Sequence, residues 1–300
     1  MRTATRVAAT LVGAAAVLGA GWGAGALAGP VGEPPAPATA GHADEEHADE
    51  EHADEEHGGS EAPAAVPDLP AGLAVSAEGH TLDLADDALP AGAAVPLSFR
   101  VLGPDGAPVT AYDTVHEQDL HLVVVRRDLT GYQHVHPTLA PDGTWTTTVA
   151  LQPGSWRVLA DSTPTDLGSG LVLGADLAVG GAWEPVPPPA PSAAAEVDGY
   201  TVTLDGDLVA GQESEVVLTV TRDGVPVTDL QPHLGARGHL VALRAGDLGY
   251  LHVHPTGGSG AEVRFAVRVP AAGDHRLFLD FRHGDVVRTA AFSLTARSAP

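Results

Sequence analysis

Short apolar runs, either continuous or alternating with polar residues, follow one another from residue 73 to residue 296. Gly, Pro and Asp stand between the runs, and no helical pattern of about 12 residues interrupts the series. The runs of the first half are 73–79, 81–89, 95–103, 120–126, 132–136, 144–151, 156–161 and 171–179. Runs of this length and spacing are typical of strands in an antiparallel β-sandwich of immunoglobulin-like type. The pattern therefore predicts an all-β chain.

The second half of the chain repeats the first. The stretch 120–137, LHLVVVRRDLTGYQHVHP, returns as 238–255, GHLVALRAGDLGYLHVHP, with ten of 18 positions identical. With one residue inserted, Asp161 returns as Asp280. The apolar runs of this half are 200–206, 214–224, 238–244, 250–254, 262–269, 275–281 and 286–294. Such self-similarity predicts two tandem immunoglobulin-like antiparallel β-sandwich domains.

The N-terminal part of the chain differs in composition. Two Arg precede an uncharged stretch of 22 residues at 7–28, as in a signal peptide or a membrane anchor. Residues 29–70 repeat HADEE three times among Pro, Ala and Gly. Such a segment cannot form a core, so we expect a disordered linker. The rest of the chain is then expected outside the cytoplasmic membrane, secreted or anchored, and in contact with the membrane through the N-terminal segment only.

These boundaries divide the chain into five parts. They are a signal peptide or membrane anchor at 1–28, a His-rich acidic linker at 29–70, a first β-sandwich at 71–183, a Pro-rich linker at 184–193 and a second β-sandwich at 194–297. The Pro-rich linker contains three consecutive prolines from Pro187, which favours a stiff connection between the two repeats.

The charge and the missing sulfur residues exclude several functions. The formal net charge is −24, from 39 acidic and 15 basic residues, and no basic cluster stands out. Nucleic acid and anionic membrane surfaces are therefore poor partners. The chain has no Cys, and its single Met is Met1, so disulfides and sulfur ligands for a metal are excluded. Imidazoles and carboxylates remain as candidate metal ligands.

The duplicated stretch is predicted to form a hairpin that carries three histidines. Strand side chains alternate between faces, so His134 and His136 project together. If Val125 pairs with Tyr132 across the turn, His121 lies on the same face as these two. Three converging imidazoles suit a transition-metal ion, whereas a single strand histidine more often only packs or faces solvent. The second copy repeats the arrangement with its own three histidines.

Asp161 and Asp280 occupy matching positions near the ends of apolar strands. Each is a candidate fourth ligand, a hydrogen-bond acceptor that orients a histidine, or the partner of a nearby Arg. The candidate metal-binding residues are thus His121, His134, His136, Asp161, His239, His252, His254 and Asp280.

Other histidines are less regular. His116 and His233 lie in the loops before the duplicated stretch, at spacings that differ by one residue, so they are only loosely equivalent. His80 occurs only in the first copy, and His275 and His283 only in the second. We expect these last three at the surface.

The apolar N-terminal segment, the acidic His-rich linker and the motif HLxVVRxDLxxYxHVHP together resemble a group of extracytoplasmic proteins from high-GC actinobacteria. More remotely, the sandwich modules resemble the YtkA-like, FixH-like and CopC-like families. That remote resemblance implies copper handling or oxidase assembly. The closer one, to the actinobacterial group, covers residues 73–296 and is carried by His121, His134, His136 and Asp161 with their second-copy partners. The Met-rich and Cys elements that many members of those families use are missing here.

The leading hypothesis is an extracytoplasmic protein that binds Cu(II) or Zn(II) and acts in metal buffering, carriage or sensing, without enzymatic turnover. Its partners would be the metal ion and an envelope protein that handles metals. A structural or interaction protein of the cell envelope, in which the histidines only pack, is the first alternative. A cupin-like metalloenzyme is the second, although Thr138 to Ala140 occupy the place of the Glu that the cupin motif needs after its H-x-H.

Overall fold

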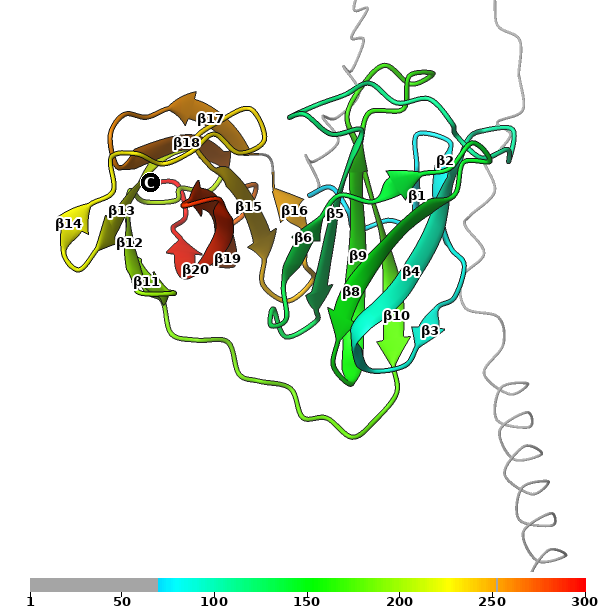
Figure 1. Ribbon diagram of the computed structural model, residues 1–300, viewed down its shortest axis with the longest axis horizontal. Helices are drawn as coiled ribbons and strands as arrows, with labels where there is room; N and C mark the ends of the chain where they lie inside the picture. Colours follow the sequence, from blue (N-terminus) through cyan, green and yellow to red (C-terminus); the bar gives the residue numbers. More distant parts are fainter. Residues whose placement is uncertain (1–69, 252) are drawn as a thin grey trace, which may run out of the picture. The chain divides into compact units, whose positions relative to one another are not determined.

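The computed structural model describes residues 70–251 and 253–300, and in them the chain forms strands and no helix (Figure 1). The prediction of an all-β fold with two repeated immunoglobulin-like sandwiches is confirmed. The predicted signal or anchor segment lies outside the described residues, as does the acidic linker up to residue 69. Within the described ranges there is no helix long and apolar enough to cross a membrane.

The first repeat consists of two five-stranded sheets packed face to face, in the orders β1-β2-β4-β8-β7 and β3-β10-β9-β5-β6. All strand pairs are antiparallel except β3 with β10. The strands are β1 (Ser76–Ala77), β2 (His80–Leu84), β3 (Ala88–Leu89), β4 (Gly92–Leu102), β5 (Leu120–Arg126), β6 (Gln133–Val135), β7 (Thr138–Leu139), β8 (Trp145–Leu151), β9 (Gly154–Ser162) and β10 (Leu171–Val179). Phe99, Trp145 and Trp156 are the largest side chains of the core between the sheets.

The second repeat has the same plan, with one sheet ordered β11-β12-β13-β18-β17 and the other β16-β15-β19-β20. A short strand, β14, pairs with β13. The strands are β11 (Ala194–Val197), β12 (Tyr200–Asp205), β13 (Glu213–Arg222), β14 (Val225–Pro226), β15 (His239–Arg244), β16 (Tyr250–Leu251), β17 (Val253–Gly257), β18 (Glu262–Arg268), β19 (Gly273–His283) and β20 (Val286–Ala296). Tyr200, Phe265, Phe281 and Phe292 fill the core.

A third apolar cluster joins the two repeats into one compact unit. Strand β5 is buried along its whole length. Its alternate residues face opposite ways, and both of its faces are covered. Its inward residues belong to the core of the first repeat, whereas Val123 and Val125 pack in a cluster with Val241 and Phe278 of the second repeat. The ring of Tyr132 stacks on that of Phe278, with centroids 3.8 Å apart and planes 4° apart. We call this set of residues the shared cluster.

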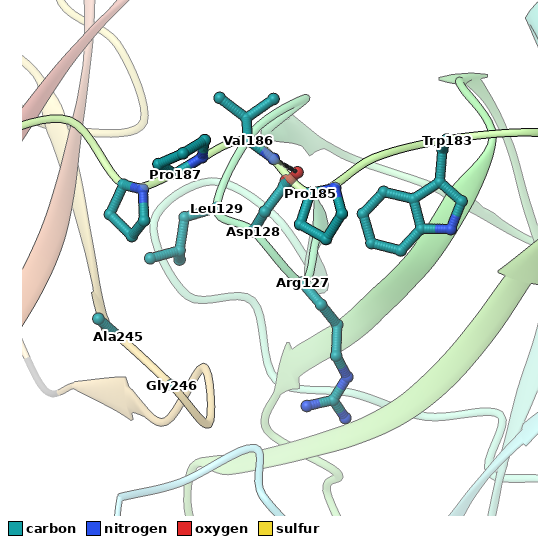
Figure 2. Close-up of a pocket in the computed structure, with 10 residues that line it drawn as sticks. Arg127, Asp128, Leu129, Trp183, Pro185, Val186, Pro187, Ala245 and Gly246 are labelled. Atoms are coloured by element: carbon teal, nitrogen blue, oxygen red, sulfur yellow. Dashed lines mark hydrogen bonds between the residues drawn. The ribbon is translucent and has the colours of Figure 1, made fainter.

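The Pro-rich linker is attached to the first hairpin at the turn between β5 and β6. The Asp128 carboxylate accepts a hydrogen bond from the Val186 backbone N–H at 2.9 Å (Figure 2). Arg126 pairs with the same carboxylate at 3.0 Å, and its guanidinium lies 5.5 Å from the ring centre of Trp183. Linker prolines, the hairpin turn and Gly246 line a cavity of about 500 Å³. The linker is therefore ordered by specific contacts and not only by its prolines.

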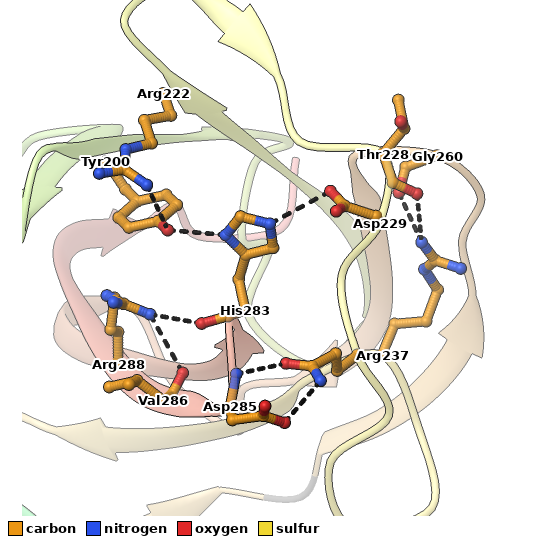
Figure 3. A network of polar contacts seen from close by, with 11 residues as sticks. Tyr200, Arg222, Thr228, Asp229, Arg237, Gly260, His283, Asp285, Val286 and Arg288 are labelled. Atoms are coloured by element: carbon orange, nitrogen blue, oxygen red, sulfur yellow. Dashed lines mark hydrogen bonds and ion pairs between the residues drawn. The ribbon is translucent and has the colours of Figure 1, made fainter.

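The expectation that His80 and His275 lie at the surface is wrong. Their exposed fractions are 1% and 2%. His80 is the first residue of β2 and His275 lies within β19, and both side chains are turned inward. The Nδ1 of each ring lies 2.9 Å from a backbone carbonyl oxygen two residues earlier in the chain. His283 is partly buried: its Nδ1 accepts a hydrogen bond from the Tyr200 hydroxyl at 2.7 Å, and its Nε2 lies 3.2 Å from Asp229 (Figure 3).

Candidate metal centre

The first hairpin adopts the register that was assumed for it. Val123 pairs with His134 across the hairpin, and His121 pairs with Asp161 on the neighbouring strand β9. His121 and His134 therefore project from the outer face of the sheet, where His136 joins them after β6 ends. One ring nitrogen from each of the three lies within 4.8 Å of the other two. The ring centroids are 4.9 to 5.3 Å apart. We call these three residues the first triad.

Hydrogen bonds fix the tautomers of two triad histidines. The Nε2 of His121 lies 3.0 Å from the carbonyl oxygen of Val115, which can only accept, so this nitrogen carries the proton. The Nδ1 of His134 lies 2.9 Å from the carboxylate of Asp280 and likewise donates. The opposite nitrogens, Nδ1 of His121 and Nε2 of His134, face each other at 3.1 Å. In the neutral rings both of these atoms carry lone pairs.

His136 contributes a third ring nitrogen, one that has no hydrogen-bond partner among the described residues. This nitrogen, Nε2, is buried. Burial, together with the neighbouring His134 and His121, lowers the pKa of His136 to about 3. Burial likewise lowers the pKa of His121 to about 4, against the opposing hydrogen bond to Val115. Both rings are therefore neutral at pH 7, the form in which imidazole binds a metal.

The second repeat does not reproduce the triad in its described residues. Leu243 pairs with Tyr250 as predicted. After Leu251, however, the chain moves to the other sheet, where His254 pairs with Ala266 on β18 and is exposed. His252 lies outside the described residues, so the predicted second site stays a prediction.

His239 lies beside the first triad instead. Its ring is stacked on that of His121, with centroids 5.3 Å apart and planes 3° apart, and lies 4.9 Å from the ring of His134. Burial, together with the nearby histidines, lowers the pKa of His239 to about 2.

The two predicted carboxylates each contact the other repeat. Asp280, opposite His239 on the sheet, accepts the hydrogen bond from His134 of the first repeat. Asp161 shares a hydrogen bond with Tyr250 of the second repeat, and burial raises the pKa of this carboxyl to about 6. Neither is paired with a neighbouring Arg, since Arg157 binds Asp176. Of the three roles considered for these carboxylates, Asp280 has that of orienting a histidine.

A cavity of about 260 Å³ opens beside these residues. Its wall includes four histidines and three carboxylates from the two repeats: His116, His121, His239, His254, Asp113, Asp119 and Asp161. The loop residue His116 packs edge-on against His121 and His239, at centroid distances of 6.0 and 5.5 Å. The charge of His233 contributes to lowering the pKa of His121, His136 and His239. Solvent can thus approach the candidate centre from this side.

Solved structures give only distant likenesses. FdeC, an Escherichia coli adhesin, is 18% identical over 76% of this chain and 66% of that chain, with a TM-score of 0.25. InvD of Yersinia pseudotuberculosis is 12% identical over 75% and 59% of the two chains, with a TM-score of 0.25. Fibronectin(III)-like modules of CbhA from Clostridium thermocellum are 12% identical over 73% and 94%, with a TM-score of 0.22. The chain spans less than two thirds of the FdeC and InvD chains, and none of these likenesses indicates a function.

The comparison with curated proteins gave no match. A family model described as "Domain of unknown function (DUF8832)" does match, over residues 75–167 and 195–298. Each matched stretch falls within one of the two repeats. The chain therefore belongs to the DUF8832 family and contains two copies of its domain.

Proposed function

We propose that the protein binds a divalent metal ion, Cu(II) or Zn(II), through His121, His134 and His136, and that it acts in metal buffering, carriage or sensing. The observation that carries this proposal is the pair of nitrogens that face each other at 3.1 Å, each on a ring whose other nitrogen donates elsewhere. Two lone pairs at this distance repel unless a proton or a cation lies between them.

The third histidine favours a metal ion over a proton. A proton shared by His121 and His134 would satisfy those two rings and would leave the buried Nε2 of His136 without a partner. A metal ion accepts all three nitrogens at once. With metal–nitrogen distances of about 2.0–2.1 Å, tetrahedral ligands lie about 3.3 Å apart. The triad reaches that spacing by small side-chain rotations, since its ligand atoms already lie within 4.8 Å of one another.

The ligand chemistry selects the ion. Cu(I) favours thiolate and thioether ligands, and the chain has no Cys and a single Met, Met1. Neutral imidazoles suit Zn(II) and Cu(II), and the Irving–Williams order places Cu(II) above Zn(II) at a given site. The bond from His134 to Asp280 is also the kind of contact that orients metal-bound histidines in proteins.

The cellular setting of this function is also part of the proposal. The uncharged stretch at 7–28 supports a location outside the cytoplasmic membrane. An ion held there by nitrogen ligands and without turnover suits storage, carriage or sensing, and a metal-handling protein of the envelope is the expected partner. The copper-handling role implied by the YtkA-like, FixH-like and CopC-like families belongs to the same proposal.

A paired titration tests the metal site. The full-length protein is stripped with a chelator and titrated with Zn(II) and, separately, Cu(II) by calorimetry. His134→Ala combined with His136→Ala is expected to lose one tight equivalent, while weak binding by the acidic linker stays the same in both proteins. The matched control replaces the corresponding histidines of the second repeat, His252→Ala with His254→Ala. If this control still binds the tight equivalent of metal, the ion is assigned to the first triad. If the unmodified protein binds no ion above the level of the double variant, an interaction protein with packed histidines becomes the better account.

A further inference from the structure

We infer that the second repeat completes the metal centre: His239 is a fourth ligand, and Asp280 positions His134, so that a single ion connects the two repeats. This inference rests on the proposed function, because it concerns the same ion. It goes beyond the sequence-based hypothesis, which assigns a separate site to each repeat.

His239 meets the first triad because the outer faces of two sheets meet. His121 and Val123 follow one another on the outer face of β5, and His239 and Val241 do the same on β15. The two valines pack together in the shared cluster, and the two histidines stack directly beside them. His239 is thus held by the interface between the repeats, within 4.9 Å of His134 measured between ring centres.

Asp280 is built into the second repeat as a buried acceptor. It is 3% exposed, and its Oδ1 accepts a hydrogen bond from the Thr289 hydroxyl on the adjacent strand at 2.5 Å. Its Oδ2 is directed across the interface to the Nδ1 of His134, whose side chain is 2% exposed. A buried carboxylate needs such donors, because an isolated charge away from water is costly. The contact fixes which nitrogen of His134 is offered to the ion, so Asp280 is a positioning residue.

A fourth imidazole suits the expected ions. Closed zinc sites in proteins are almost always four-coordinate and tetrahedral, and three histidines leave one position for a further ligand. His239 is the nearest further imidazole whose ring contacts two members of the triad. The neighbouring cavity, with His116 and Asp161 on its wall, gives the ion a polar route from solvent. An ion bound in this way favours the packed arrangement of the repeats, because it binds only when both contribute.

The test counts ligands and measures affinity on the full-length protein loaded with Zn(II). X-ray absorption at the zinc edge is expected to give four imidazoles in the unmodified protein. His239→Phe keeps an aromatic ring on His121 but removes the ligand, so we expect three imidazoles and an affinity at least tenfold weaker. Asp280→Asn is expected to keep four imidazoles and to weaken binding tenfold to a hundredfold, as substitution of a ligand's hydrogen-bond partner typically does. His283→Phe removes a histidine outside the centre, and it should change neither the count nor the affinity.

The outcomes separate this inference from the proposed function. If the unmodified protein binds no Zn(II), the metal function fails before any variant is compared. If His239→Phe keeps the original affinity and the original imidazole count, the ion belongs to the first triad alone and the inference is overturned. If Asp280→Asn binds as tightly as the unmodified protein, the positioning role is overturned. Thermal melts of each stripped protein confirm that the variants compared are folded.

Discussion

Replacement of Phe278 by Ala tests whether the shared cluster couples the two repeats. Phe278 lies on β19, but its side chain points away from the core of its own repeat and into the shared cluster. It is 3% exposed and its ring stacks on that of Tyr132 of the first repeat at 3.8 Å. The substitution therefore removes contact between the repeats and leaves both sandwich cores intact.

The expected cost follows from the buried area. An aromatic side chain buries about 150–250 Å², which corresponds to about 4 kcal/mol at the lower end of that range at about 25 cal/mol per Å². Loss of the aromatic pair adds about 0.5–1.5 kcal/mol, and partial collapse of the cavity offsets some of the total. We therefore expect Phe278→Ala to lower the free energy of unfolding by about 4 kcal/mol, within the range measured for buried Phe in general.

Calorimetry shows where this loss falls. The unmodified protein is expected to unfold in one cooperative transition, because the shared cluster links the repeats. Phe278→Ala should split it into two transitions, one for each sandwich. The matched control is Phe99→Ala, which removes an equally buried ring from the core of the first repeat alone. The control should lower the stability of that repeat without uncoupling the two. A loss below about 1 kcal/mol, or the same single transition in both variants, would refute the coupling.

Two further predictions concern stability away from the candidate centre. Burial raises the pKa of Asp128, but hydrogen bonds from Arg126 and from the Val186 backbone, among others, outweigh it and lower the pKa from 3.8 to about 2. Asp128→Asn should therefore lower the free energy of unfolding, measured with urea at pH 7, by about 2 kcal/mol. This difference from the unmodified protein should be present above pH 3.8 and vanish as the pH falls through about 2. A difference independent of pH would contradict this. Tyr200→Phe removes the hydroxyl that donates to His283 at 2.7 Å, and a loss of about 1 kcal/mol in the same assay is expected, whereas an unchanged midpoint would contradict it.

The sequence predicts the fold well because each repeat has clear strand periodicity and turn residues. Periodicity alone places the three histidines of the first hairpin on one face, and the register assumed for that hairpin, with Val123 opposite His134, is the one observed. The packing of the two repeats against each other through the shared cluster is not predicted. Contacts between two sheet faces that are far apart in the sequence leave no periodic signal. The sequence held one indication: LHLVVVR has apolar residues on both faces, as in a strand covered on both sides. In the structure every position of this strand, β5, is buried.

The second triad shows a different limit. Equivalent sequence predicts equivalent structure, yet the chain after Leu251 crosses to the other sheet, where His254 pairs with Ala266 instead of joining the hairpin of His239. When one strand pairs with the other sheet of the sandwich, neither the apolar pattern nor the spacing of the histidines changes, so the sequence gives no sign of it. The inward turn of His80 and His275 is hidden for a similar reason, since one nitrogen of each ring lies 2.9 Å from a backbone carbonyl oxygen two residues earlier in the chain.

The most direct test of the metal centre is a crystal of the full-length protein grown or soaked with Zn(II) and, separately, with Cu(II). Anomalous difference maps on either side of each absorption edge locate the ion and identify it. We predict one strong peak bonded to Nδ1 of His121, Nε2 of His134 and Nε2 of His136, with the Asp280 carboxylate still bonded to Nδ1 of His134. The absence of a peak at these three nitrogens in both crystals would contradict the account.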